Sequence, residues 1–227
     1  MYIYKRVSKK MNDSRTKTDR EQSLVAKEFI WDTSTNTEVH FYVEPVLRKW
    51  LNSEKANTLL DLGCGNGALT ARLNQFGLLC TGTDFSDSGI QIAQATFPNV
   101  NFFQSVMQDD LAQKYQSQFD VVISVEVIEH LLLPRQLFER AKEALKPGGT
   151  LIITTPYHGY WKNLALALAN KYDSHWHPLR DYGHVKFFSI STLEKLFEEQ
   201  GFLVESICRV GRIPAFARSV MIKGKLL

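Results

Sequence analysis

An α/β fold, with a mostly parallel sheet covered by helices on both faces, is what this sequence of 227 residues predicts. Three observations support it: short apolar runs typical of buried strands, helical repeats between them, and glycine or proline where each pattern stops. Strands that alternate with helices at this spacing form βαβ units, in which the strands are parallel. A composition of 44% hydrophobic and 22% charged residues is that of an ordinary globular domain.

The expected elements begin with helical spacing of apolar residues over about 38–52, where Pro45 predicts a helix start or a kink. A short apolar run ended by glycines then predicts a buried strand at 58–62. The elements that follow are a helix at 69–76 stopped by Gly77, a strand at 78–83, a helix capped by Ser86 and closed by Pro98, and a strand at 100–103.

The second half of the chain continues the alternation. Ser191 and Glu194 have the spacing of a capping box, which predicts the start of a late helix that Gly201 stops. The other elements expected here are a strand at 119–125, a helix over about 135–145 that ends at Lys146-Pro147-Gly148-Gly149, a strand at 150–154, and a hairpin-like pair of strands at 202–209 and 219–224.

Charge is unevenly spread along the chain. Residues 1–20 hold seven basic and two acidic side chains, a net charge of +5, so the rest carries −2 of the overall +3. A weakly acidic body argues against a nucleic-acid partner, which needs a basic face on the folded part. We interpret residues 1–30 as a basic, flexible N-terminal segment; the alternative is a tether to anionic lipid, a peripheral membrane contact, or a partner.

Cysteine usage and hydropathy bear on location. Cys64, Cys80 and Cys208 do not have the spacing of a zinc site, and a sparse, odd set fits a reducing compartment. The sequence shows no secretory signal and no run of the ~18–20 apolar residues that span a bilayer. We therefore expect a cytoplasmic protein, of an oligomeric state that the sequence does not indicate.

A glycine-rich turn follows the first predicted strand. Gly63, Gly65 and Gly67 stand between a strand and a helix, where they allow a tight turn and a close approach of ligand to backbone N–H groups. Asp84 follows Gly63 by 21 residues, close to the ~20 expected for a carboxylate that binds ribose hydroxyls. The third glycine comes one residue earlier than in the GxGxxG of nicotinamide enzymes, and Asp61 suits an ammonium or sulfonium better than a pyrophosphate.

The run LDLGCGNG (60–67) and the run TGTDFS (81–86) resemble the first two motifs of class I S-adenosylmethionine (SAM)-dependent methyltransferases. FDVVISVEVIEHL (119–131) and ALKPGGTLIITTP (144–156) resemble the fourth and fifth strand regions, and the likeness covers roughly residues 40–225. It implies a seven-stranded, Rossmann-like sheet, mostly parallel with an antiparallel last strand, formed by residues 31–227.

The resemblance also implies how SAM is bound. Asp84 becomes the acid that binds the ribose, and Ser105 stands where many members have an acid at the turn that contacts the adenine. The cofactor-binding residues expected from the family's motifs are Asp61, Gly63, Gly65, Gly67, Asp84, Phe85, Ser105, Val106 and Glu126.

Glu126, Glu129 and His130 resemble the ExxEH motif of the ubiquinone-biosynthesis O-methyltransferases, where these residues are associated with magnesium. On a helix, residues at i, i+3 and i+4 share a face, so three metal ligands would converge. The alternative is that the motif lines the pocket without a metal, because magnesium usually prefers an all-oxygen shell.

Residues 157–188 form an insertion rich in aromatic and histidine side chains, where class I enzymes place substrate-recognition elements. Aromatic rings in a lid cover an apolar or sugar-like acceptor and exclude water. For His158 and His184, a role in the pocket and a structural role are both open. The HxH pair His175 and His177 is by itself a weak metal signal.

Together these features predict methyl transfer from SAM to a hydroxyl of a small-molecule, quinone-like or lipid/sugar acceptor. His130 or His158 would remove the hydroxyl proton, or a metal at Glu126, Glu129 and His130 would lower its pKa. The rival interpretations are a nicotinamide-dependent oxidoreductase, a non-catalytic SAM-binding module and an RNA methyltransferase.

Overall fold

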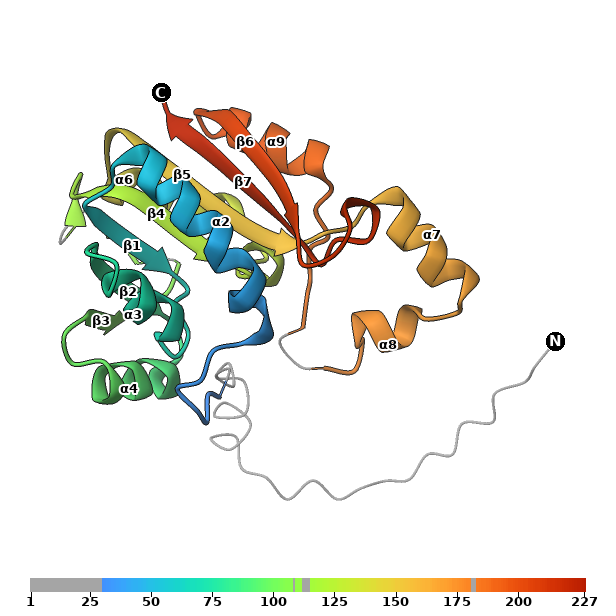
Figure 1. The fold of residues 1–227 in the computed structure, drawn as a ribbon, viewed down its shortest axis with the longest axis horizontal. Helices are drawn as coiled ribbons and strands as arrows, with labels where there is room; N and C mark the ends of the chain where they lie inside the picture. Colours follow the sequence, from blue (N-terminus) through green and yellow to red (C-terminus); the bar gives the residue numbers. More distant parts are fainter. Residues whose placement is uncertain (1–29, 108, 112–114, 181–182) are drawn as a thin grey trace, which may run out of the picture.

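The computed structural model describes residues 30–107, 109–111, 115–180 and 183–227 (Figure 1). The basic segment expected at 1–30 lies outside these ranges, except for its last residue. One seven-stranded sheet has the order β3-β2-β1-β4-β5-β7-β6. Its strands are β1 (Thr58–Leu62), β2 (Leu79–Asp84), β3 (Asn101–Gln104), β4 (Phe119–Val125), β5 (Leu145–Pro156), β6 (Phe202–Val210) and β7 (Ser219–Leu226).

The direction of the strands confirms the predicted architecture. Strands β1 to β5 pair in parallel, whereas β7 runs antiparallel to both β5 and β6. Since the carboxyl ends of parallel strands meet at one edge of the sheet, the loops after β1, β2 and β4 come together there. The glycine turn and Asp84, predicted to bind the cofactor, therefore lie at the same edge of the sheet as the ExxEH motif that follows β4.

Helices cover both faces of the sheet, as the apolar pattern requires. Successive residues of β1 alternate: Leu59 packs with one core cluster and Leu60 with the other, both fully buried. Helices α2 (Glu38–Glu54), α3 (Ala68–Asn74) and α4 (Asp87–Thr96) contribute to the cluster of Leu59. Helices α6 (Arg135–Ala144) and α9 (Ile190–Glu199) contribute to that of Leu60 (Figure 1).

Two elements start further from the prediction than the others do. Helix α9 begins at Ile190, so Ser189 is its N-cap: the Ser189 Oγ accepts from the Thr192 N–H (3.2 Å) in a capping box. The predicted capping box of Ser191 and Glu194 was wrong: these residues have the right spacing, but the N-cap lies two residues earlier, at Ser189. Strand β5 starts at Leu145 rather than at 150, because Leu145 already pairs with Phe119. Helix α2 continues through Pro45 as a single helix.

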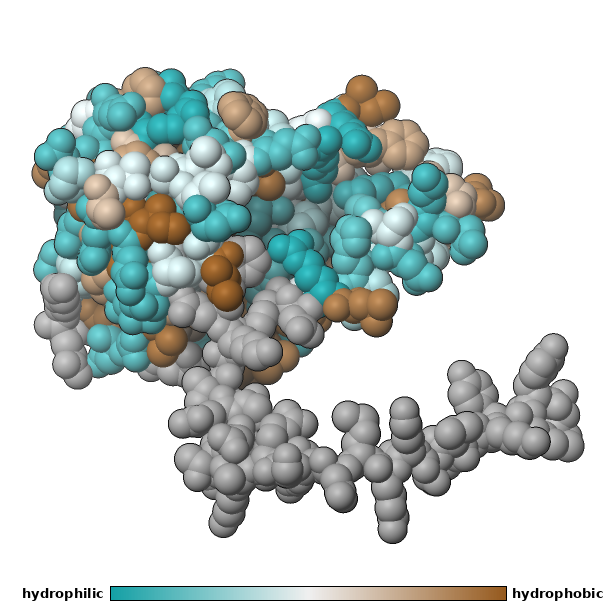
Figure 2. All heavy atoms as spheres, turned by 90° about the horizontal axis from the view of Figure 1, so that it is seen from below, coloured by the Kyte–Doolittle hydropathy of each residue, from teal (hydrophilic) through white to brown (hydrophobic). Residues whose placement is uncertain are grey.

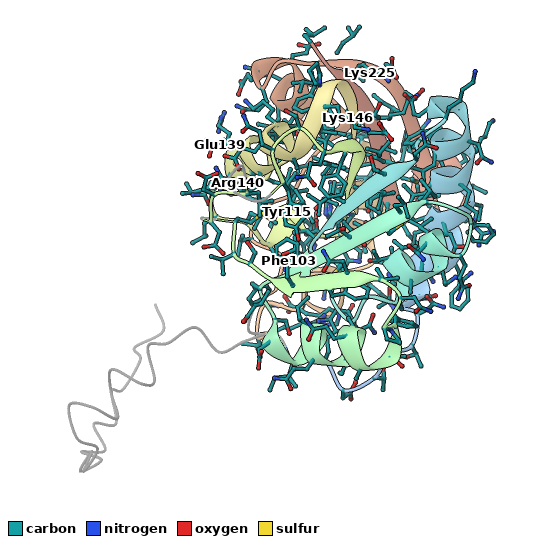
Figure 3. All side chains as sticks on the ribbon, turned by 90° about the vertical axis from the view of Figure 1, so that its left-hand side faces the viewer. Phe103, Tyr115, Glu139, Arg140, Lys146 and Lys225 are labelled. Carbon is teal, nitrogen blue, oxygen red and sulfur yellow. The ribbon has the colours of Figure 1, made fainter. Side chains whose placement is uncertain are left out.

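The β3 edge of the sheet carries the turn expected to contact adenine. Phe103 of β3 stacks on Tyr115, with ring centroids 5.0 Å apart, and the two side chains lie together in Figure 3. Tyr115 is buried and packs in turn on Phe119 at the start of β4 (5.8 Å between centroids). These ring contacts fix the end of β3, and with it the turn that follows.

The insertion after β5 projects from the body at the edge where the loops meet (Figure 1). It contains α7 (Tyr160–Leu168) and α8 (Tyr172–Trp176), and no residue of either helix is buried. Tyr160, Trp161 and Leu168 are strongly exposed, and apolar atoms are visible on this lobe in Figure 2. Among the described helices, none has the length and apolar character to cross a bilayer.

Candidate functional site

Gly63 and Gly67 have different tasks in the glycine turn after β1. The N–H groups of Gly63 and Cys64 both donate to the Thr83 carbonyl (2.7 and 3.0 Å), which closes the turn against β2. A Cβ at Gly67 would lie 2.7 Å from Ala93 and Phe102, so this glycine lets α3 pack closely. All three glycines have positive φ angles, 87°, 55° and 75°, which favour glycine.

Asp84, at the end of β2, is fixed relative to this turn. One carboxylate oxygen accepts from the Gly65 N–H (2.8 Å) and the other from the Ser86 N–H (2.9 Å). The side chain is 8% exposed, so a ligand at this edge can still reach it. A carboxylate oriented in this way suits the two hydroxyls of a ribose, as the sequence predicts.

Asp61 is an acid buried beneath the turn. Its Oδ2 accepts from the Thr70 hydroxyl (2.6 Å), whereas its buried Oδ1 has no hydrogen-bond partner among the described residues. Burial, together with the charge of Asp84, raises the pKa of Asp61 to about 7. The negative charges of Asp61 and Asp84 repel each other. A cationic ligand would offset this repulsion, whereas a pyrophosphate would add to it. The residues present therefore fit SAM better than a nicotinamide dinucleotide.

The predicted adenine side offers apolar surface. Phe85 and Val106 are 44% and 43% exposed at the ends of β2 and β3. The Ser105 hydroxyl (3.0 Å) and the Val106 N–H (2.9 Å) both donate to Asp109 Oδ2. A carboxylate, that of Asp109, is thus present at the turn although Ser105 stands at the position expected for an acid, and no motif in the sequence points to Asp109.

A second site lies between the sheet edge and the insertion. It is a cavity of about 150 Å³ to which the residue after β4, strands β5 and β7, helix α2 and the insertion all contribute. The lining residues are Tyr42, Glu126, Pro156, His158, Lys162, His175, Trp176, His184, Arg218 and Ser219. Of these, Glu126, His158 and His184 are pocket residues that the sequence predicts, whereas Tyr42, Lys162, Arg218 and Ser219 carry no such signal in the sequence.

Glu126 has a backbone conformation that is rare for a residue with a side chain, φ 55°. Its N–H donates to the Thr154 carbonyl (3.1 Å), and its carboxylate accepts from the Thr154 hydroxyl (3.0 Å). Burial raises the pKa of Glu126 to about 7. Hydrogen bonds from Ser219 and Thr154 and the charge of Lys162 lower it, but by less than burial raises it. Such strain and such a pKa are typical of functional sites.

This conformation overturns the shared helix face expected for the ExxEH motif. Only Ile128–His130 is helical, as a single 3-10 turn, and Glu126 precedes it in the left-handed region. Glu129, His130 and His184 instead bring their ligand atoms within 4.8 Å of one another, without Glu126. One carboxylate and two imidazoles do not match the oxygen shell of magnesium, so the residues do not fit the predicted ion.

The two histidines predicted as bases have different surroundings. His158 lines the cavity, stacked on Trp176 (5.0 Å between centroids) and edge-on to Phe187 (5.3 Å), and burial lowers its pKa to about 4. His130 does not line the cavity; its ring lies against His184, with centroids 4.9 Å apart. Of the two, His158 is thus placed at the cavity, but as a weak base.

The glycine turn and the cavity meet at the end of β4. Glu126 lines the cavity, and the next residue, Val127, packs on Gly63, where a Cβ would overlap the valine side chain. A molecule in the cavity and a ligand on the turn would therefore both lie beside the Glu126–Val127 segment. This adjacency is what a transfer reaction between two bound molecules requires.

Comparison with known proteins identifies the family. A family model described as a methyltransferase domain matches residues 36–207. The ubiquinone biosynthesis O-methyltransferase of Hydrogenovibrio crunogenus is 28% identical over 182 residues, which cover 77% of this chain and 75% of the relative. The protein of the same name from Coxiella burnetii is 25% identical over 200 residues, with coverage of 84% and 85%.

Solved structures support the fold. Magnesium protoporphyrin IX methyltransferase from Synechocystis aligns with a TM-score of 0.62 at 18% identity, covering 82% of each chain. A putative methyltransferase from Bacillus halodurans aligns with a TM-score of 0.62 at 16% identity, covering 79% of this chain and 97% of the other.

Proposed function

This chain belongs to the methyltransferase-domain family and is a SAM-dependent methyltransferase, and we propose that it methylates a hydroxyl of a small, ring-sized acceptor bound in the Glu126 cavity. The observation on which the proposal rests is the junction at the end of β4. There Glu126 faces the cavity while Val127 packs on Gly63 of the cofactor turn.

The cofactor would be held by the residues that end β1 and β2. In this proposal Asp84 binds the ribose hydroxyls, Asp61 balances the positive charge, and Phe85 and Val106 flank the adenine. When bound, SAM supplies a methyl group on a sulfonium, an electrophile with a good neutral leaving group. The chain then has to align the acceptor, exclude water and accept the hydroxyl proton.

Glu126 is the base that the geometry favours. A general base works best with a pKa near the operating pH, and that of Glu126 is raised to about 7, whereas that of His158 is lowered to about 4. In this proposal the acceptor hydroxyl transfers its proton to the Glu126 carboxylate as its oxygen becomes the nucleophile. Lys162 and Arg218 supply positive charge that stabilises the oxyanion.

The size and lining of the cavity favour an aromatic hydroxyl acceptor. A cavity of about 150 Å³ matches the scale of one that holds a benzene ring. Trp176 and Pro156 give it apolar walls, and Tyr42 and Ser219 add hydroxyls that can orient a polar substituent. A quinone-like phenol, the acceptor class suggested by the names of the relatives, fits these features; lipid- or sugar-linked hydroxyls are the second candidates.

A panel assay tests the proposal. The full chain is incubated with SAM and with catechol, a benzoquinol, or a sugar alcohol as control, and formation of S-adenosylhomocysteine (SAH) and of the methyl ether is followed by mass spectrometry. We expect methyl ethers from the phenols, and formation on the order of 100-fold slower or more from Glu126→Gln under the same conditions. Methylation of a ring carbon instead of the phenol oxygen, or full activity of Glu126→Gln, would contradict it.

A further inference from the structure

A short strap, residues 31–36, crosses the glycine turn before α2 begins. The Asn66 side chain lies within that turn and is 1% exposed. Its amide nitrogen donates to the carbonyl oxygens of Thr33 (2.8 Å) and Thr35 (2.9 Å), and its oxygen accepts from the Ala68 N–H (3.2 Å). A residue of the cofactor turn thus ties down a segment more than 30 residues earlier in the chain.

The ring at the start of this strap rests on the second glycine. The Trp31 N–H donates to the Ser88 hydroxyl (3.1 Å), at the start of α4. A Cβ at Gly65 would overlap the six-membered part of the indole, and one at Gly89 would lie 2.9 Å from its Cδ1. The absence of side chains at these two positions is therefore what makes room for the indole.

The strap is held by hydrogen bonds over open space rather than by a packed core. Between it and α3 lies a cavity of about 420 Å³. Its lining residues are Ser34, Thr35, Asn36, Phe41, Ala68, Ala71, Arg72, Gln75 and Phe97. A segment with few buried apolar contacts and a few hydrogen bonds opens at low free-energy cost.

We propose that this strap is the lid of the cofactor site and that Trp31 is a cofactor-contacting residue. In glycine turns of this kind the second glycine is where the backbone comes closest to the ligand, and here the Trp31 ring faces that glycine. The same glycine is hydrogen-bonded to Asp84, the proposed ribose ligand. The inference rests on the proposed cofactor, and its test separates the two.

Tryptophan fluorescence tests the contact. The chain has four tryptophans, and Trp161, 63% exposed on α7, serves as the matched control. We expect SAH to change the emission of the full chain, and Trp31→Phe to remove more than half of that change while Trp161→Phe retains it. An emission change that survives intact in Trp31→Phe would overturn the contact.

Asn66→Asp tests the lid. This variant keeps an oxygen for the Ala68 N–H but cannot donate to Thr33 and Thr35, so the turn is capped while the strap is released. We expect SAH to dissociate on the order of tenfold faster, measured by stopped-flow displacement, with an unchanged circular dichroism spectrum. SAH binding with unaltered dissociation would overturn the lid alone; absence of SAH binding to the wild-type chain, measured by calorimetry, would overturn the cofactor proposal as well.

Discussion

The Asp84 carboxylate lies 2.8 Å from the backbone nitrogen of Gly65 and accepts its hydrogen bond. The acid at the end of one strand and the second glycine after the neighbouring strand are thereby held in one arrangement. Because Ser86 donates to the other carboxylate oxygen, at 2.9 Å, the orientation of Asp84 is set before any ligand arrives. Such preorganisation lowers the entropic cost of ligand binding, because the side chain need not be ordered when the ligand binds.

Replacing Asp84 therefore has a predictable effect on cofactor affinity. We expect Asp84→Ala to raise the Kd for SAH on the order of 100-fold, since a hydrogen bond to a charged group contributes about 1.5–3 kcal/mol. Isothermal titration calorimetry measures it. Asp87→Ala, an exposed acid at the start of α4, is the control and should bind SAH as the wild type does. An unchanged Kd in Asp84→Ala would mean that the ribose lies elsewhere.

The pKa of Asp61 makes cofactor binding depend on pH. Its pKa of about 7 means that the buried carboxyl is largely protonated below neutral pH, whereas the cationic ligand prefers the ionised form. We expect the Kd for SAM, which carries the sulfonium charge, to rise by up to about tenfold per pH unit as the pH falls below 7. Titrations from pH 5.5 to 8.5 measure this slope, and Asp61→Asn should bind weakly with the slope removed. A slope that persists in Asp61→Asn would assign the titration to another group.

Asp61 also links stability to pH in the opposite direction. A carboxyl whose pKa is higher in the folded chain stabilises the fold fully at low pH, and this contribution is lost as the pH rises through about 7. The loss begins near the ordinary pKa of 3.8 and is complete above about 7, so we expect Asp61→Asn to melt at a higher temperature than the wild type at pH 8, by roughly 5 °C, and by a smaller margin at pH 5. Differential scanning fluorimetry without cofactor measures both. A lower melting temperature of the variant at pH 8 would show that the ionised carboxyl is well solvated or paired.

The sequence predicts those parts of the site that are formed by segments close together in the chain. The glycine turn joins consecutive elements, and the distance from Gly63 to Asp84 follows from one helix between two neighbouring strands. The cavity is different because its walls come from distant segments. Tyr42 and Ser219, 177 residues apart, bring their hydroxyl oxygens within 3.4 Å only once the sheet has formed.

The ExxEH motif shows why a spacing can mislead. Three residues at i, i+3 and i+4 converge only on a helix, and the left-handed conformation of Glu126 places it outside the short 3-10 turn. Nothing in the sequence signals a positive φ at a glutamate, since such residues are uncommon. The partner that the structure gives to Glu129 and His130 is His184, from the insertion.

Glu126 should be needed for turnover but not for cofactor binding. We expect Glu126→Gln to lower kcat on the order of 100- to 1000-fold, the range for loss of a general base, with a Kd for SAH within about threefold of wild type. His130→Ala, outside the cavity, should have the smaller effect on kcat. The comparison uses the best acceptor of the phenol panel. If His130→Ala slowed turnover as much and Glu126→Gln did not, the base would be the histidine predicted from the sequence.

Lys162 tests the electrostatics of the cavity through the pH profile. Its ammonium lowers the pKa of Glu126, while burial, Arg212 and Arg218 lower its own. Removing this charge in Lys162→Met should raise the pKa of Glu126 by roughly one unit. Because the base must be ionised to accept a proton, the acidic limb of kcat/KM against pH should then move to higher pH. Lys171→Met, exposed between α7 and α8, is the control and should leave the limb in place. A limb that does not move in Lys162→Met, while kcat falls, would mean that Lys162 contacts the acceptor without tuning Glu126.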